Sequence, residues 1–404
     1  MTQAVGIGRR PLLMVVVSAN FIIAAFGLSL SPMLPEAMRT FNTGVATLAW
    51  AGGAYGLATA LAATAGAPAQ DRFAPFNVIG GGIGLHCLGL LLVWRSGSWI
   101  LFVTGYLVCG LAVGVLYPAL VSAIAAQSPV SGRGPLIARS SLGWALSFLL
   151  GVPLATAITA LGNWRMIPLS FLILWGLVLG VLWRTRCALK SEVRADRAIS
   201  SGPSGLNVEV PRHLSIFACT FCGFAAFYGL YSLLGLAVYD HGLGLAYAGQ
   251  LTAAFGLGFL IASRLGLVLE RCSAPATLLG PLALVASITA AIPLSLARSY
   301  GVTMLLMVIW GVAHILFFTA ATTILSGFDA GRRGRFLSFN QAAISVGVAA
   351  GPILCSNIYV VSDYRFVGLA CSVAALLALL FGYIGVESGA DVRLKAQTED
   401  LEDG

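Results

Sequence analysis

Hydrophobic residues in this chain are gathered into long runs that short polar segments separate. A run of about 20 apolar residues crosses the roughly 30 Å hydrocarbon core of a bilayer as an α-helix. Such runs lie at 12–34, 46–68, 75–94, 98–126, 137–161, 166–184, 213–239, 246–268, 276–297, 300–326, 336–360 and 366–386. The pattern therefore predicts an all-α integral membrane protein with twelve transmembrane helices.

The runs fall into two sets on either side of the longest polar stretch. That stretch, at 184–212, is rich in Arg, Ser and Gly, which is typical of a flexible linker. We therefore expect an N-terminal six-helix half at 1–183, a cytoplasmic linker at 184–212, a C-terminal six-helix half at 213–387 and an acidic cytoplasmic tail at 388–404.

Three motifs of the first half return at a nearly constant spacing in the second. Asp71-Arg72 returns 199 residues later as Glu270-Arg271, and Pro153 returns as Pro352 at the same spacing. Trp164-Arg165 returns 200 residues later as Tyr364-Arg365. These coincidences indicate duplication of a six-helix unit, a plan that places a solute site between the halves of many transporters. A duplicated scaffold without transport is the alternative.

Charge adds an orientation and excludes several functions. Charged residues make up 9% of the 404 positions, and most of the 23 Lys and Arg residues fall on the side that holds both termini. Basic loops stay cytoplasmic, so we expect both termini in the cytoplasm. The net charge of +8 then reflects contact with anionic lipid at the plasma (inner) membrane, and we expect no nucleic-acid partner.

Catalytic and metal-binding patterns are missing from the sequence. We find no nucleotide-binding loop, no His-Glu-x-x-His motif and no nucleophile with an evident base. Cys219 and Cys222 form a Cys-x-x-Cys pair, but in an apolar helix we interpret it as packing. We expect neither enzymatic activity nor a cofactor nor a metal.

The loop after the second run resembles a motif of the major facilitator superfamily, Gly-x-x-x-Asp-Arg-x-Gly-Arg. Residues 67–75 read Ala-Pro-Ala-Gln-Asp-Arg-Phe-Ala-Pro, with Ala67 in place of the leading Gly. The second copy, at 266–271, begins with Gly and ends in Glu-Arg. The resemblance implies a fold of two six-helix halves and, for Asp71, Arg72, Glu270 and Arg271, a role in the cytoplasmic gate.

The fifth run resembles the drug:proton antiporter branch of that superfamily, which consists of exporters. It carries Gly151-Val152-Pro153, close to the branch's Gly-Pro motif but with Val152 inserted. The branch often has an arginine in its fourth helix, where this chain has Tyr106. The resemblance implies proton-coupled efflux, although the expected coupling arginine is absent.

Ionisable groups deep in the runs are candidates for function because their burial is costly. Two histidines qualify, His86 in the third run and His314 in the tenth. The family's tenth helix lines its cavity, so His314 is the candidate for proton coupling. The alternative is a neutral histidine that forms hydrogen bonds between helices.

The resemblance also implies that the first, fourth, seventh and tenth helices line a solute cavity. Polar and aromatic residues on them are Asn20, Tyr106, Tyr117, Tyr228, Tyr231, Trp310 and His314, with Tyr55, Trp144 and Gln341 as second choices. Tyrosine and tryptophan offer an apolar body with one polar group. With no deep Arg, Lys or carboxylate beside them, we expect a neutral or weakly polar organic solute.

The sequence thus favours a monomeric secondary transporter that exports a small solute in exchange for protons by alternating access. An uptake carrier or uniporter of the same fold is the first alternative, because the coupling arginine is missing. A non-transporting membrane receptor or assembly factor is the second.

Overall fold

The computed structural model describes residues 5–65, 73–126, 139–192, 210–269, 274–326 and 333–402, which are helical apart from short turns. The first half contains α1 (Val5–Leu28), α2 (Leu30–Phe41), α3 (Val45–Ala65), α5 (Pro75–Trp94), α6 (Trp99–Ala126), α8 (Leu142–Leu146), the π-helix η1 (Ser147–Gly151), α9 (Val152–Ala160) and α10 (Met166–Glu192). The second contains α11 (Val210–Asp240), α12 (Leu245–Leu269), α13 (Ala274–Ser295), α14 (Tyr300–Ser326), α15 (Arg333–Val361) and α16 (Tyr364–Glu402).

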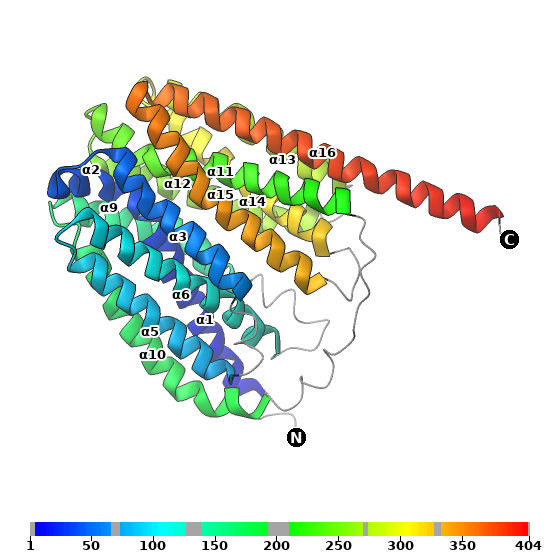
Figure 1. Ribbon diagram of the computed structural model, residues 1–404, viewed down its shortest axis with the longest axis horizontal. Helices are drawn as coiled ribbons and strands as arrows, with labels where there is room; N and C mark the ends of the chain where they lie inside the picture. Colours follow the sequence, from blue (N-terminus) through cyan, green and yellow to red (C-terminus); the bar gives the residue numbers. More distant parts are fainter. Residues whose placement is uncertain are drawn as a thin grey trace.

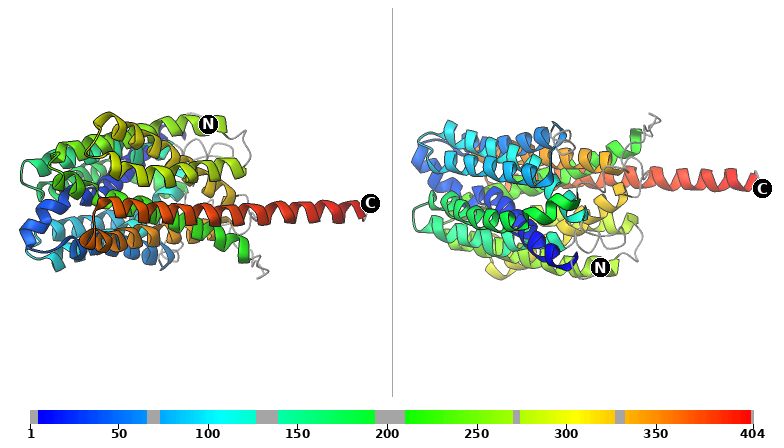
Figure 2. Two further views of the ribbon diagram at one scale, coloured as in Figure 1. Left: turned by 90° about the horizontal axis from the view of Figure 1, so that it is seen from above. Right: turned by 90° about the horizontal axis from the view of Figure 1, so that it is seen from below.

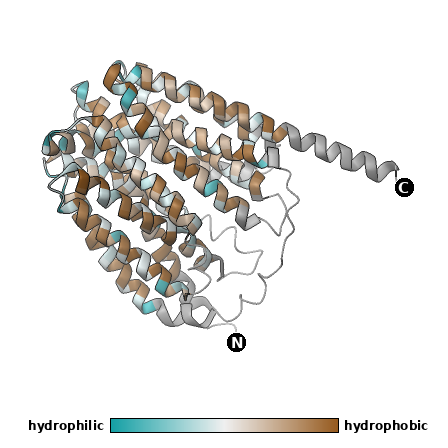
Figure 3. Cartoon of the chain, in the orientation of Figure 1, coloured by the Kyte–Doolittle hydropathy of each residue, from teal (hydrophilic) through white to brown (hydrophobic). Residues whose placement is uncertain are grey.

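These helices lie alongside one another as a bundle, and α16 extends well beyond it (Figures 1 and 2). Hydrophobic residues cover the helix bodies, and hydrophilic residues gather at the ends near α2 and α9 (Figure 3). Within the described ranges, 12 spans are long and apolar enough to cross a membrane. The predicted all-α architecture with twelve transmembrane helices is confirmed.

The two sets of six spans pack in the same way. In the first, α3 and α5 both pack on α6, and α10 packs on α5 and α1. The second repeats this with α12 and α13 on α14 and with α16 on α13 and α11. Between the sets, α3 packs on α15 and α9 on α12, again as a related pair. This correspondence is what an internal duplication produces.

The first hydrophobic run contains two helices instead of one. It was predicted as a single span over 12–34, but α1 ends at Leu28 and α2 begins at Leu30. Pro32 has no N–H to donate to the carbonyl of Leu28, and its ring would clash there, so a straight helix cannot continue. The α2 segment packs across the ends of α3, α9 and α11.

The fifth span is interrupted in its middle by the π-helix η1. Pro153 lies two residues after the end of η1 and leaves the carbonyl of Leu149 without its α-helical donor. Single π turns of this kind are frequent at functional sites. Here η1 carries Phe148 toward the second half, where α12 packs against it.

Glycine permits a close contact between helices of the first half. Gly110 of α6 lies against the backbone of Tyr55 in α3, where an added Cβ would approach the carbonyl carbon and Cα of Tyr55 to 2.9 Å. The backbone of Tyr55 cannot move aside for the added methyl group as the tip of a flexible side chain could. We expect Gly110→Ala to destabilise the protein by about 1–3 kcal/mol, measured as thermal unfolding in detergent. Gly280→Ala, which has open space around it, is the control; equal stability of the two variants would contradict this packing.

Helices extend into the segments predicted as linker and tail. Helix α10 continues through Glu192 and α11 begins at Val210, so the predicted linker begins and ends inside helices. The tail expected from 388 onward continues α16 through Glu402. Hydropathy marks where a helix leaves the membrane, whereas polar residues with good helix propensity extend it beyond that point. Residues 193–209 lie outside the described ranges.

Candidate functional site

A cavity of about 170 Å³ lies between the two halves. The first half contributes residues of α1, α2, α3, α6, α8 and η1, and the second contributes residues of α11, α12, α14 and α15. The lining begins at Ser31, in the first turn of α2. It extends to Ala63, near the end of α3, and to Ser141, directly before α8. The cavity therefore reaches from the α2 end of the bundle toward the end at which α3 finishes and α8 begins.

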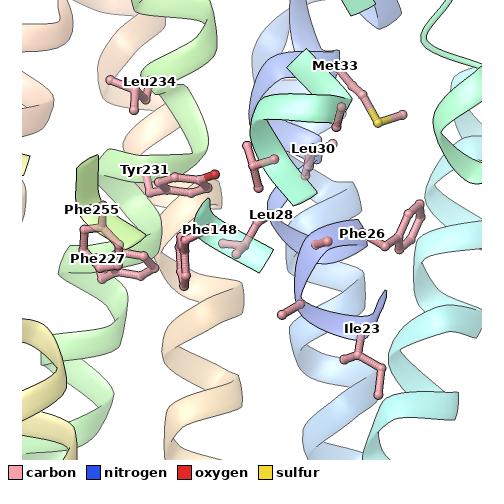
Figure 4. Packing of buried hydrophobic residues seen from close by; sticks show 14 of the residues in the cluster. Ile23, Phe26, Leu28, Leu30, Met33, Phe148, Phe227, Tyr231, Leu234 and Phe255 are labelled. Carbon is pink, nitrogen blue, oxygen red and sulfur yellow. The ribbon is translucent and has the colours of Figure 1, made fainter. Parts of the chain in front are cut away.

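Aromatic rings form much of its wall. Phe227 of α11 stacks on His314 of α14 with ring centroids 4.3 Å apart and on Tyr231 at 5.5 Å. Phe148 from η1 meets Tyr231 edge-on at 6.1 Å, which brings the two halves together (Figure 4). On the opposite wall Tyr106 stacks on Phe26 at 4.8 Å. Such surfaces suit a solute with aromatic or alkyl parts.

Two polar atoms of the lining are buried without a hydrogen-bond partner, His314 Nδ1 and the Tyr231 hydroxyl. Thr252 of α12 donates its own proton to the carbonyl of Ala248 (2.9 Å), so it has no proton left to donate to the Tyr231 hydroxyl. Other lining hydroxyls, such as that of Thr59, bond to backbone carbonyls. Buried polar groups normally have partners, so His314 and Tyr231 are the groups that a bound solute would satisfy.

Charge is absent from the described residues that line the cavity, which include no Asp, Glu, Lys or Arg. Two described carboxylates have partners elsewhere: Glu36 of α2 pairs with Arg39 at 3.0 Å, and Asp240 at the end of α11 accepts a hydrogen bond from Tyr359 at 2.5 Å. A solute in this cavity would be held by stacking, shape and hydrogen bonds. An ion would lose its hydration there without a compensating partner.

The halves meet at the α2 end of the cavity. Ser31 of α2 hydrogen-bonds the backbone of α11 at Tyr231 and Gly235. Further along the same two helices, the Arg39 guanidinium donates to the Tyr239 hydroxyl and lies 5.0 Å from the centre of its ring. These contacts close this end of the cavity.

Most of the sequence-predicted site residues lie on the cavity wall. They are Tyr106, Tyr117, Tyr228, Tyr231 and His314, together with the second choices Tyr55, Trp144 and Gln341. Asn20 and Trp310 are not in the lining. The Asn20 amide donates to the Ser140 carbonyl at 3.0 Å, and Trp310 packs behind Phe227 and Phe255. Both are on the expected helices but on faces turned toward neighbouring helices.

Sequence reasoning named one residue on each of α3 and α15, Tyr55 and Gln341, and missed the other lining residues of these two helices. On α3 the lining residues are Gly52, Tyr55, Gly56, Thr59 and Ala63, and on α15 they are Gln341, Ile344, Ser345, Val348 and Pro352. Both sets follow the same spacing, which marks one face of a helix. Small or polar residues predominate on the α3 face, whereas Ile344 and Val348 make the α15 face partly apolar.

His86 lies apart from the cavity. Its Nδ1 accepts a hydrogen bond from the Trp175 indole at 3.0 Å, which joins α5 to α10, and its Nε2 is buried without a partner. The contact matches a neutral histidine that links helices. The predicted gate residues Asp71, Arg72, Glu270 and Arg271 lie outside the described residues.

Comparison with known proteins gives matches over nearly the whole chain. A family model described as Major Facilitator Superfamily matches residues 16–328 and 216–401. The uncharacterised MFS-type transporter YwfA of Bacillus subtilis (strain 168) is 26% identical over 397 residues, covering 96% of this chain and 95% of that protein. The crystal structure of the human organic anion transporter MFSD10 (TETRAN) is similar in fold, with a TM-score of 0.65 and 16% identity over 93% of this chain and 99% of that one.

Proposed function

The chain belongs to the major facilitator superfamily, and from that premise we propose that it is a secondary transporter exporting a small, neutral or weakly polar organic solute. Transport proceeds by alternating access, with the halves at 1–183 and 213–387 rocking about the site between them. The observation that carries this proposal is the uncharged, aromatic cavity that both halves line and that is closed at the α2 end. The protein works as a monomer in the inner membrane with both termini cytoplasmic.

The proposed solute follows from the wall of the cavity. Aromatic faces bind its ring or alkyl part, and His314 and Tyr231 bond its polar group. A transporter of similar fold is named for organic anions. We do not extend that substrate class to this chain, because no Arg or Lys is among the described lining residues.

Proton coupling is the second part of the proposal, by analogy with the drug:proton antiporter branch that the fifth span resembles. We assign the binding of the proton to His314. One observation favours the alternative of an uptake carrier or uniporter: rings of Phe224, Phe227, Phe255 and Phe317 surround His314, and the described residues of the cavity lining include no Asp or Glu. A protonated imidazole there would have no anionic partner.

Proteoliposomes separate the two modes of transport. With a pH-sensitive dye inside the vesicles, we expect addition of a neutral aromatic solute to release protons down an imposed gradient, and His314→Phe to abolish that release. If solute moves at the same rate after the proton gradient has been collapsed, the uniporter is favoured.

The proposed cytoplasmic gate gives a further prediction. The Asp71 carboxylate would hold the gate closed by facing arginines and a helix N-terminus of the other half. We expect Asp71→Asn to lower transport at least about tenfold with little loss of folded protein, measured as flux per unit of monodisperse protein. Asp363→Asn, in the turn between α15 and α16 where the carboxylate accepts a hydrogen bond from the Arg365 N–H, is the matched control; normal flux in Asp71→Asn would exclude the gate.

A further inference from the structure

Ser31 makes an unusual pair of hydrogen bonds across the two halves. Its hydroxyl donates to the Tyr231 carbonyl oxygen at 2.8 Å and accepts from the Gly235 N–H at 3.0 Å. In an α-helix these two backbone groups bond to each other, because the N–H of residue i donates to the C=O of residue i−4. A side chain of one half thus bonds to both groups of one backbone pair of a helix in the other.

Ser29, two residues earlier and also buried, behaves differently. It lies between α1 and α2 and donates to the carbonyl of Ala25, four residues before it in α1. That is the usual local bond of a helical serine. The contact of Ser31 also requires Gly235, since a Cβ there would fall on the Ser31 carbonyl and 3.0 Å from the Pro32 Cα.

The two side-chain contacts between α2 and α11 each join residues at equivalent positions of the internal repeat. Ser31 meets Tyr231, and Arg39 meets Tyr239, each 200 residues apart. This spacing matches that of the repeated motifs, so the contacts lie where the axis relating the halves passes. Separation of the halves at this end must break them.

We propose that Ser31 is a releasable clasp that sets the position of Tyr231 when the α2 end closes. When the halves part, the Gly235 N–H and the Tyr231 carbonyl satisfy each other within α11, and the Ser31 hydroxyl turns to a carbonyl of its own helix. No buried polar group is left without a partner in either state. The clasp therefore stabilises closure without making opening prohibitive.

Closure and the solute site are linked through this turn of α11. Tyr231 presents its carbonyl to Ser31 and its ring to Phe227 and Phe148 at the cavity wall. Tyr231 and Ser31 both line the cavity. Ser31 thus acts as a positioning residue for the aromatic wall. The inference rests on the proposed alternating access, but on neither the solute nor proton coupling.

Spin labels at the α2 end test the clasp in the purified full-length protein. Labels carried by p-acetylphenylalanine at Gly44 and Leu243, in the two loops of this end, report the distance between the halves by double electron–electron resonance. We expect a short distance to dominate, and Ser31→Ala to raise the ratio of long to short distances roughly tenfold, as loss of two hydrogen bonds would. Gly235→Ala should raise it further by steric exclusion.

Ser29→Ala and Gly280→Ala are the matched controls, because neither touches the contact between the halves. The clasp would be overturned if Ser31→Ala gave the same distance distribution as the wild type. It would also be overturned if the wild type did not show the short distance. A distance shift in Ser31→Ala in a protein that carries no solute would support the clasp and count against transport, so the two proposals fail separately.

Discussion

Replacement of His314 by phenylalanine is expected to weaken binding of a neutral aromatic alcohol, 2-naphthol, about tenfold while leaving the unliganded protein at least as stable as before. Phenylalanine keeps the ring that stacks on Phe227 but removes Nδ1, which is buried without a partner. Loss of one hydrogen bond to a solute corresponds to about tenfold in affinity. Removal of an unsatisfied polar group does not destabilise the empty protein. Quenching of tryptophan fluorescence measures binding, and thermal unfolding in detergent measures stability.

Tyr231→Phe should act in the same way, since it removes the other unsatisfied atom of the cavity wall. Tyr247→Phe is the matched control: its hydroxyl is also buried, but it lies outside the cavity lining. Naphthalene, which has no hydroxyl, should bind all variants alike. Equal binding of 2-naphthol to the wild type and to both cavity variants would show that these atoms do not bind the solute.

Gln341→Glu is expected to admit a cationic solute that the wild type rejects. The side chain lies on the cavity wall, and the substitution adds a negative charge at nearly constant shape. A carboxylate about 6 Å from a cation at an effective dielectric constant of about 20 contributes about 3 kcal/mol of attraction. We therefore expect 2-naphthyltrimethylammonium to bind at least about tenfold more tightly to the variant at pH 8, where the carboxylate is ionised.

The control for this prediction is Gln250→Glu on α12, where the native amide accepts a hydrogen bond from Tyr300 away from the cavity. It should leave selectivity unchanged. A Gln341→Glu protein that binds 2-naphthol normally and gains nothing for the cation would show that the solute binds elsewhere.

The twelve spans could be predicted from hydropathy because lipid leaves the backbone almost no alternative to a helix. Breaks in a helix inside a span were harder to predict. The hydropathy of this run stays high through Leu28 and Leu30 despite two serines, and Pro32 is the signal that a second helix begins. The π turn at Phe148 likewise follows from a hydrogen bond that Pro153 cannot make. Hydropathy does not report such local losses of a donor.

The site was predictable to the level of helices but not of helix faces. Family resemblance indicated the tenth helix, yet of its two candidates His314 faces the cavity and Trp310 packs behind Phe227. Their spacing of four residues places them on nearly one face, so only the packed structure separates them. The contributions of Gly56 and Ser345 were missed because small residues carry no chemistry that draws attention. Their value is the close approach of α3 to α15.

Counterflow tests the central claim of alternating access most directly. Proteoliposomes are loaded with an unlabelled excess of the compound that stabilises the purified protein most in a panel of drugs, sugars, nucleosides and organic acids, and are then diluted into a trace of the same compound in labelled form. A carrier with one site between two moving halves predicts transient accumulation of label above its equilibrium level, without any proton gradient. Label that never exceeds that level, in vesicles whose protein binds the compound, would contradict transport and identify the chain as a receptor on a transporter fold.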